Sequence, residues 1–366
     1  MNRIEKALMH GLFLHLHHNT DKALDFAAFK RLNDVVAQTS PARLLIGPDA
    51  NDDAGVVGID NHFIVGKMES HCSPSAVRPY DSAGTGVGGA CRDVVAMGGQ
   101  PLFIMDFIGT MPLDKEILVG PCAFKGVCTC GACKTMTSHE RTNLMLAGIR
   151  DMARALGVYV AGGGFSTSFS EIVPAVVVAV IGKLVTQKPL TKPAKRPGDA
   201  LILVGQTGTD GNDTLFRAGA TETMKPAQAL FQEERASMDA MLNVFRKHES
   251  SISACSDLGA AGIGAAVCES MRYGGYGAQV DLALMPTRDN PTPEELLVCE
   301  SQARMLLQVN HPDAGAVLDT IRQTGAPAAR IGHVVNGTES VFVHDGTPVA
   351  TIPNAITEAQ LAQIKS

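Results

Sequence analysis

The glycine-rich segment 67–101 constrains the fold of this chain more than any other part of it. It reads K-M-E-S-H-C-S-P-S-A-V-R-P-Y-D-S-A-G-T-G-V-G-G-A-C-R-D-V-V-A-M-G-G-Q-P. The pattern predicts a strand, a polar loop, a glycine-rich turn and then a helix. We expect backbone N–H groups to turn toward a phosphate, ahead of the helix, at Gly84, Gly86, Gly88 and Gly89. Arg92 and Asp93 would follow about one turn into that helix, and a carboxylate beside bound phosphates usually needs Mg²⁺ between them.

Further motifs accompany this segment in a fixed order. They are N-D-D-A-G-V-V from Asn51, G-G-G-F-S-T-S-F from Gly162, R-P-G-D-A-L-I-L-V-G-Q-T-G-T-D-G from Arg196, S-D-L-G-A-A-G-I from Ser256 and C-E-S-Q-A-R-M-L from Cys299. Together with segment 67–101, they make residues 40–335 resemble the formylglycinamide ribonucleotide amidotransferase (phosphoribosylformylglycinamidine synthase) family. In that family, the first segment has the sequence pattern E-S/T-H-N-H-P-S-A followed by G-A-A-T-G-x-G-G-x-x-R-D. It is part of the aminoimidazole ribonucleotide synthetase superfamily.

The resemblance implies an α/β (α+β) class and a two-domain aminoimidazole ribonucleotide synthetase-like fold. Residues 1–183 would form an ATP- and Mg²⁺-binding domain with a cysteine-rich loop at 120–135, and its mixed sheet would join a second copy in a dimer barrel. Residues 184–347 would form the C-terminal α/β domain, and 348–366 a tail. A homodimer, or a heterodimer with a separate second copy, is therefore expected.

Local patterns give several elements independently of the resemblance. Alternation predicts strands at 43–47, 54–69 and 101–109, and the valine-rich run 172–181 predicts a buried strand. Periodicity predicts helices in 1–40, before Gly157, over 226–248 and over 257–271. Thr292 to Glu295 form a capping box with proline at the first helical position. The proline-rich stretch from Lys188 reads as an interdomain linker.

The resemblance also implies roles for individual residues. His71 matches the catalytic histidine, and an imidazole can move a proton near neutral pH. ATP binding is implied for Lys67, Gly86, Gly88 and Gly89. Metal carboxylates are implied at Glu69, Asp93 and Asp257, with Asp52 and Asp53 as additional contacts. Substrate contacts are implied for Ser70, Cys72, Ser73, Arg92, Gln228, Glu300, Ser301 and Gln302. The alternatives for these side chains are helix caps, strand-edge groups and surface charges.

The chain departs from the family pattern at several points. E-S-H-N-H-P becomes E-S-H-C-S-P, so the second histidine is replaced by Ser73. The N-terminal motif E-H-C-S-x-K-S and the G-D-P turn after Gln228 are not visible. No glutaminase domain follows, so we expect ammonia or another nucleophile to come from a separate donor. These differences leave the nucleotide site intact and put the purine substrate in question.

The expected function is that of an ATP- and Mg²⁺-dependent, C–N ligase-like enzyme that activates an amide or carbonyl oxygen by phosphorylation. Its substrate would be a small, phosphorylated molecule. Two alternatives stay open: a specialised paralogue that acts on another small molecule, and a non-catalytic or metal-binding subunit of a larger complex.

Composition limits the partners and the compartment. The formal net charge of −6 argues against nucleic acid as a main partner. The N-terminus lacks the apolar run of a signal peptide, and the longest apolar run, 172–181, is too short to cross a bilayer. We therefore expect a cytoplasmic protein without membrane partners.

Four of the nine cysteines crowd into one short segment, P-C-A-F-K-G-V-C-T-C-G-A-C-K. Cys122, Cys128, Cys130 and Cys133 could hold Zn²⁺ or an iron–sulfur cluster, although their spacing differs from that of zinc-ribbon pairs. The alternative is a surface loop with reduced thiols. His15, His17 and His18 form a cluster that could ligate metal, but their spacing matches no familiar metal site and favours a solvated helix face.

Overall fold

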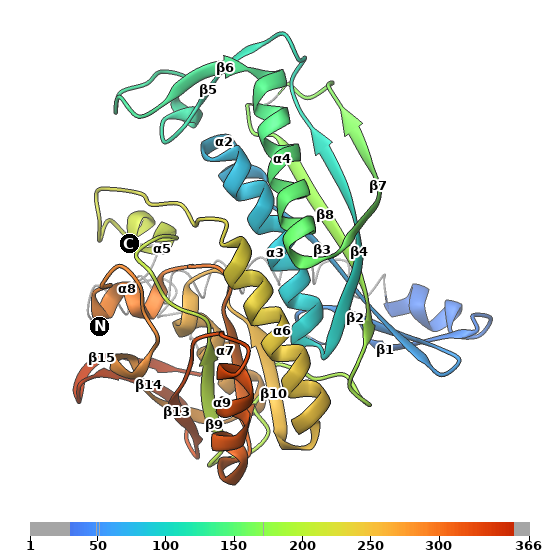
Figure 1. Cartoon of the computed structure of the whole chain (residues 1–366), viewed down its shortest axis with the longest axis vertical. Helices are drawn as coiled ribbons and strands as arrows, with labels where there is room; N and C mark the ends of the chain where they lie inside the picture. The colour runs from blue at the N-terminus through green and yellow to red at the C-terminus, as the bar shows by residue number, and fades with distance from the viewer. Residues whose placement is uncertain (1–29, 49, 51, 171, 355–366) are drawn as a thin grey trace.

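The computed structural model describes residues 30–48, 50, 52–170 and 172–354, and these form two α/β units that share a core (Figure 1). The expected histidine cluster at 15–18 and most of the helix expected in 1–40 lie outside the described residues, but residues 30–36 are helical.

The first unit is built on a six-stranded sheet in the order β1-β2-β3-β8-β4-β7. These strands are β1 (Ala42–Ile46), β2 (Gly55–Ile59), β3 (His62–Ser70), β8 (Ala175–Leu184), β4 (Gly99–Gly109) and β7 (Tyr159–Ser166). All neighbours are antiparallel except β4 and β7. The valine-rich run expected to be buried supplies β8, where Val176, Val178 and Val180 point into the core.

Two helices cover one face of this sheet. They are α3 (Pro79–Ala96), preceded by the short α2 (Cys72–Val77), and α4 (Ser138–Leu156), which ends as expected with Gly157 in the left-handed conformation. A small hairpin of β5 (Glu116–Val119) and β6 (Lys134–Thr137) carries the cysteine-rich loop with its 3-10 turn η1 (Ala123–Lys125).

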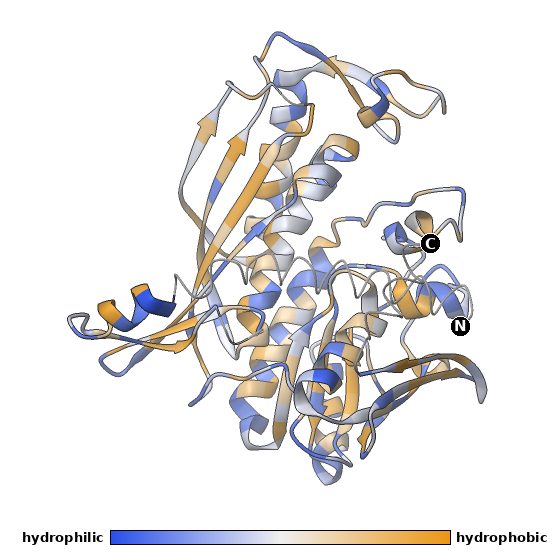
Figure 2. Cartoon of the chain, turned by 180° about the vertical axis from the view of Figure 1, so that it is seen from behind, coloured by the Kyte–Doolittle hydropathy of each residue, from blue (hydrophilic) through white to orange (hydrophobic). Residues whose placement is uncertain are grey.

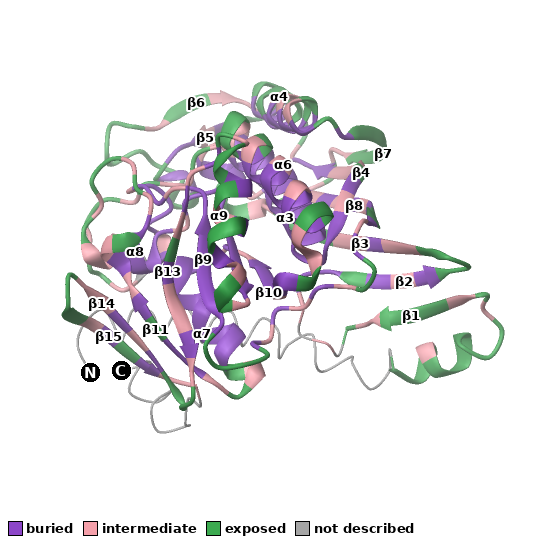
Figure 3. Cartoon of the chain, turned by 60° about the horizontal axis from the view of Figure 1, so that its bottom comes forward, coloured by how far each residue is buried: buried purple, intermediate pink, exposed green. Residues whose placement is uncertain are grey.

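The second unit is a seven-stranded sheet in the order β10-β12-β9-β13-β11-β14-β15. Its strands are β9 (Ala200–Val204), β10 (Ile252–Asp257), β11 (Gly277–Asp281), β12 (Met305–Val309), β13 (Ala328–Val335), β14 (Glu339–His344) and β15 (Thr347–Pro353). β15 pairs with β14, so the sheet extends into the residues that we expected to form a tail. Figure 3 shows β9 buried at the centre, whereas β1 at the edge of the first sheet is largely exposed.

Helices lie against both faces of the second sheet, so β9 is buried along its whole length. The helices are α5 (Asp213–Arg217), α6 (Phe231–His248), α7 (Gly262–Gly274), α8 (Pro293–Val298) and α9 (Ala314–Arg322), with short 3-10 turns at Glu249–Ser251, Leu282–Leu284 and His311–Asp313. The capping box at Thr292 is confirmed. The helix expected over 257–271 begins only at Gly262, because Asp257 ends the unpredicted strand β10.

One hydrophobic cluster joins the two units. It contains Val87 and Val94 from α3, Met241 from α6 and Ile202 from β9. Helices α3 and α4 therefore lie between the first sheet and α6 (Figure 1). This arrangement brings residues about 200 positions apart in sequence to one place.

Candidate functional site

Strand β3 and helix α3 create the centre of the candidate site. Alternation along β3 directs Lys67 and Glu69 to the same face, toward α3. The Lys67 Nζ atom lies 2.8 Å from Asp93 Oδ2 on α3 and also donates to the Asp53 carbonyl oxygen at 2.8 Å. Burial alone would lower the pKa of Lys67, but the carboxylate of Asp93 outweighs it and raises that pKa, so the ammonium is charged.

Three carboxylates from distant segments meet beside Lys67. Asp53 precedes β2, Asp93 lies on α3 and Asp257 ends β10, and each offers an oxygen within 4.8 Å of the others. We call these residues the carboxylate trio. Burial, and then the charge of Asp53, raise the pKa of Asp257 to about 6, and burial raises the pKa of Asp93 well above its ordinary value. Mutual repulsion of buried carboxylates is what a hard divalent cation relieves, so this set of oxygen donors fits Mg²⁺.

Positive side chains surround the carboxylate trio. Lys192 Nζ lies 2.7 Å from Asp53 Oδ1 and 3.3 Å from Glu269 Oε2, and Arg92 Nε lies 3.8 Å from Asp257 Oδ2. Sequence reasoning placed Lys192 in a linker and missed it, because nothing in a lysine-rich linker distinguishes one lysine from the next.

Asp52 points away from the carboxylate trio. Its Oδ1 accepts the Lys192 backbone N–H at 2.8 Å, and burial raises its pKa to about 6. Asp52 thus fixes the linker to the first unit, whereas Asp53 is itself a member of the trio.

His71 follows β3 and is oriented from two sides. Its Nδ1 lies 3.1 Å from Thr85 Oγ1, and its Nε2 lies 3.4 Å from Glu69 Oε1. Burial acts to raise the pKa of Glu69, but the hydrogen bond and charge of His71 lower it below its ordinary value. The second oxygen, Glu69 Oε2, is buried and has no hydrogen-bond partner among the described residues. A buried carboxylate oxygen left in this state is suited to a ligand or a cation.

The predicted glycine-rich turn is wrong. Gly84, Gly86, Gly88 and Gly89 lie inside α3, which begins at Pro79, and Asp93 is near the end of this helix and not one turn from its start. A Cβ atom at Gly89 would lie 2.8 Å from Glu69 Oε2, and one at Gly86 would lie 3.4 Å from the His71 ring. Because these glycines lack a Cβ atom, the side chains of Glu69 and His71 can approach the helix closely. This role differs from the predicted one, in which the glycines would bind an anion through their backbone N–H groups.

Arg92 is buried and connects the two units. Its Nη1 pairs with Glu234 on α6, and its Nη2 donates to Gln302 Oε1 at 2.8 Å. Glu234 was missed by sequence reasoning, since a lone glutamate in a helical pattern predicts a solvated face. Because the Arg92 guanidinium is engaged within the protein, its expected contact with a substrate phosphate has no support in this arrangement.

The other expected substrate residues fall into two groups. Ser70 ends β3 on the face opposite Lys67, and Cys72 and Ser73 begin α2 directly after His71. In the second unit, Ser301 Oγ donates to Asp210 Oδ1 at 2.9 Å, and the Gln228 backbone N–H donates to Asp210 Oδ2 at 2.9 Å. Asp210, which sequence reasoning missed, thus gathers two expected contacts.

The triplet Glu300, Ser301 and Gln302 is divided between two places. Glu300 Oε1 accepts from Thr214 Oγ1 and from the Ala261 backbone N–H, both at 3.1 Å, while Gln302 faces Arg92. Gln302 thus reaches the surroundings of the carboxylate trio through its contact with Arg92.

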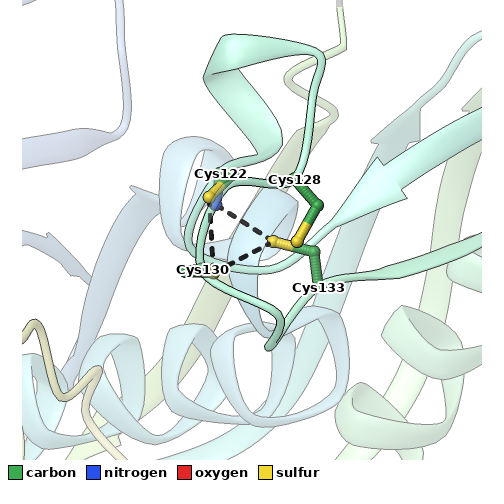
Figure 4. Close-up of side chains that lie close together, drawn as sticks. All are labelled: Cys122, Cys128, Cys130 and Cys133. Atoms are coloured by element: carbon green, nitrogen blue, oxygen red, sulfur yellow. Dashed lines mark hydrogen bonds between the residues drawn. The ribbon is translucent and has the colours of Figure 1, made fainter.

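The four clustered cysteines form a second candidate site (Figure 4). Their sulfur atoms all lie within 4.8 Å of one another at the end of the β5–β6 hairpin. Cys122 Sγ lies 3.3 Å from Cys130 Sγ, and Cys130 Sγ lies 3.8 Å from Cys133 Sγ. All four are free cysteines.

Two family models match consecutive parts of the chain. The N-terminal domain of AIR synthase related proteins matches residues 51–184, and the C-terminal domain of the same proteins matches residues 196–345. The chain belongs to the AIR synthase related proteins. The expected family and the expected two-domain α/β fold are thereby confirmed.

Two curated relatives of this AIR synthase related protein are PurL subunits. The phosphoribosylformylglycinamidine synthase subunit PurL of Lacticaseibacillus paracasei is 32% identical over 345 residues, covering 90% of this chain and 43% of that protein. The PurL subunit of Methanocaldococcus jannaschii is 30% identical and covers 98% of this chain and 47% of its own length. The chain therefore spans about half the length of these curated relatives.

Solved structures show the same relation. Thermotoga maritima PurL complexed with FGAR is 27% identical, with a TM-score of 0.69 over 84% of this chain and 48% of that chain. The same protein complexed with ATP is 27% identical, with a TM-score of 0.67 over 82% of this chain and 45% of that one. The hydrogenase maturation protein HypE in complex with ATP, 15% identical with a TM-score of 0.60, shares the fold alone.

Within the described residues, no helix has both the length and the apolar character that crossing a membrane requires.

Proposed function

We propose that this chain is an ATP- and Mg²⁺-dependent enzyme that phosphorylates an amide or carbonyl oxygen of a small molecule, in the manner of a C–N ligase. One observation carries the proposal: the carboxylate trio, Lys67 and the His71–Glu69 pair come from separate segments and converge on one partly buried site. Relatives that have been solved in complex with ATP, ADP and FGAR support it.

The residues of this site would have separate roles in the reaction. The carboxylate trio, with Glu69 Oε2 beside it, would hold Mg²⁺, which supplies charge neutralisation for the transferring phosphoryl group. Lys67 would fix the position of Asp93, and its positive charge would favour binding of an anionic ligand nearby. His71 would move a proton at Nε2, while Thr85 holds its Nδ1 side.

The acceptor oxygen attacks the γ-phosphorus of ATP and the bond to ADP breaks, which leaves a phosphorylated imidate or acyl group. A nitrogen nucleophile then adds to the activated carbon, and the C–O bond breaks with release of phosphate. The nucleophile would be ammonia delivered by a separate donor.

We place the acceptor substrate along α2. Ser70, Cys72 and Ser73 flank His71 there, and Gln228 with Ser301 at Asp210 would contribute from the second unit. Arg92 is engaged by Glu234 and Gln302. Cys72 and Ser73 occupy the positions at which the family pattern E-S-H-N-H-P has asparagine and its second histidine. These differences favour a specialised paralogue whose acceptor differs from FGAR. A non-catalytic, metal-binding subunit is the remaining alternative.

We further propose a homodimer formed through the first sheet. The face of this sheet opposite α3 exposes large apolar side chains, shown as hydrophobic colour along its strands in Figure 2. Met68, Ala179 and Met105 form one row across β3, β8 and β4, and Met68 and Met105 are 69% and 42% exposed. A two-layer unit with such an uncovered apolar face is suited to packing against a second copy.

Binding of Mg-ATP tests the proposal most directly. A ligand that binds only the folded state stabilises it by mass action, so saturating Mg-ATP should raise the Tm by several degrees, while ATP with EDTA should not. Asp93→Asn should lose most of this shift, because it removes one oxygen donor from the carboxylate trio. An unchanged Tm at saturating Mg-ATP would contradict the proposal.

A measurement of turnover then distinguishes between the two hypotheses of an enzyme and a non-catalytic subunit. Phosphate release from ATP should appear with ammonia and one member of a panel of amides that includes FGAR. His71→Ala should lower this rate by about 10²-fold or more and keep the Mg-ATP shift in Tm. His62→Ala, which alters an exposed histidine at the start of the same strand, is the matched control and should keep both.

A further inference from the structure

We propose that Cys122, Cys128, Cys130 and Cys133 bind one zinc ion per chain as a mononuclear tetrathiolate site. The site is separate from the carboxylate trio, and its argument does not depend on the proposed function. It rests on the geometry of the four sulfur atoms, on the composition of the loop that carries them, and on the contact of this loop with α2.

The sulfur geometry fits a single ion. Tetrahedral zinc with Zn–S bonds of about 2.3 Å sets its four sulfur atoms about 3.8 Å apart. Here, Cys122–Cys130 and Cys130–Cys133 have Sγ–Sγ distances of 3.3 and 3.8 Å, and all four sulfur atoms lie within 4.8 Å of one another. In an iron–sulfur cluster the four cysteines are distributed over two or more iron atoms, and sulfur atoms bound to different irons lie farther apart than those on one ion. The observed convergence therefore favours one metal ion.

The backbone is shaped to bring these thiols together. The β5–β6 hairpin pairs Val119 with Lys134, so both ends of the loop are held in register. Gly126 and Gly131 adopt φ values of 70° and 71°, which turn the chain back between the cysteines. The Cys122 backbone N–H donates to Cys133 Sγ at 3.2 Å, as backbone amides commonly do toward metal-bound thiolates.

The loop has almost no hydrophobic core of its own. Between residues 121 and 132, only Cys122 and Ala123 are buried, and Phe124 and Val127 are 53% and 67% exposed. A segment that cannot bury apolar surface needs another source of stability, and metal binding supplies folding free energy directly. Four thiolates and one divalent ion leave a net charge of about −2, which the neighbouring Lys125 and Lys134 would offset.

The loop also touches the element that begins beside His71. The Gly120 backbone N–H donates to the Ala76 carbonyl oxygen at 3.4 Å, and η1 packs against α2. Cys72 and Ser73 open α2, so an ion in the loop would hold in place the helix along which we propose that substrate binds. This consequence rests on the proposed function, whereas the metal site itself does not.

Metal content tests the proposal. Protein purified without added metal should contain about one equivalent of zinc per chain by elemental analysis and keep it through dialysis against EDTA. Cys130→Ser should lose most of this zinc, and Cys72→Ser, the same chemical change outside the cluster, should retain it. Zinc retained by the Cys130 variant would overturn the assignment.

Cobalt substitution tests the coordination in the unaltered chain, so the outcome does not depend on how a variant folds. Metal-free protein titrated with Co²⁺ should develop the visible bands of tetrahedral cobalt thiolate and saturate near one equivalent. Iron in several equivalents with cluster absorption would overturn the mononuclear site. So would metal-free protein whose four thiols are freely alkylated and which gives no cobalt bands.

Discussion

Asp257 shows how a single half-buried charge shapes this site. Its raised pKa of about 6 means that the folded protein retains a proton that the unfolded chain has lost between about pH 4 and pH 6. Metal-free protein should therefore lose stability as the pH rises through this window and stay at the lower level above it. A cation bound to the carboxylate trio would reverse this loss.

The variant Asp257→Asn should remove both effects. At pH 7.5 in EDTA, its free energy of unfolding should exceed that of the unaltered chain by about 1–3 kcal/mol, because the Asn side chain carries no charge to desolvate. At pH 4.5 the difference should be smaller. Urea unfolding at the two pH values measures this, and Asp345→Asn in an exposed turn is the control. A pH-independent difference would contradict the role of Asp257 ionisation.

Helix α3 illustrates the scale of one element. It contains four glycines in its interior, although glycine normally costs a helix about 0.5–1 kcal/mol relative to alanine. The helix tolerates them because side chains from β3 and α6 approach where a Cβ atom would otherwise lie: a Cβ at Gly89 would meet Glu69, and one at Gly88 would meet Glu234, each at 2.8 Å.

The variant Gly89→Ala should therefore behave opposite to its helix propensity. Overpacking against Glu69 should lower the free energy of unfolding by about 1–3 kcal/mol and weaken Mg-ATP binding. Gly315→Ala in α9, where a Cβ atom would meet no heavy atom within 4 Å, should instead stabilise the protein by about 0.5–1 kcal/mol. Urea unfolding of both variants measures the contrast, and a stabilised Gly89 variant would show that the helix has space there.

At the scale of the whole molecule, the first sheet differs from the second because helices cover only one of its two faces. Its inner face packs on α3 and α4, while its outer face exposes Met68 and Met105. The second sheet, in contrast, has helices on both faces. Dimerisation through the first sheet would cover its outer face, so that both sheets of the chain would be covered on both faces.

The variant Met105→Glu should dissociate the proposed dimer, because it places a charge within the apolar row, next to Ala179. Sedimentation or light scattering should give the mass of a dimer for the unaltered chain and that of a monomer for the variant. Leu284→Glu, which alters an exposed leucine of the second unit, should stay dimeric. A monomeric unaltered chain at micromolar concentration would rule out the dimer.

The sequence by itself determined the family, the two-unit α/β class and the elements whose signals are local. The valine run of β8, the Gly157 stop of α4 and the Thr292 capping box depend on neighbours within a few residues, so their patterns were sufficient. The sulfur cluster was visible for the same reason, since its four cysteines lie within twelve residues.

Only the tertiary structure decided which charges meet. Lys192 and Glu234 look like surface residues in sequence, and they become partners of Asp53 and Arg92 because the shared core brings the linker and α6 onto the first unit. The α3 glycines were read as a turn because glycine signals both a bend and a close contact, and local sequence does not distinguish the two. The reason is physical: desolvation and pairing depend on atoms about 140 residues away in the chain, which no local pattern records.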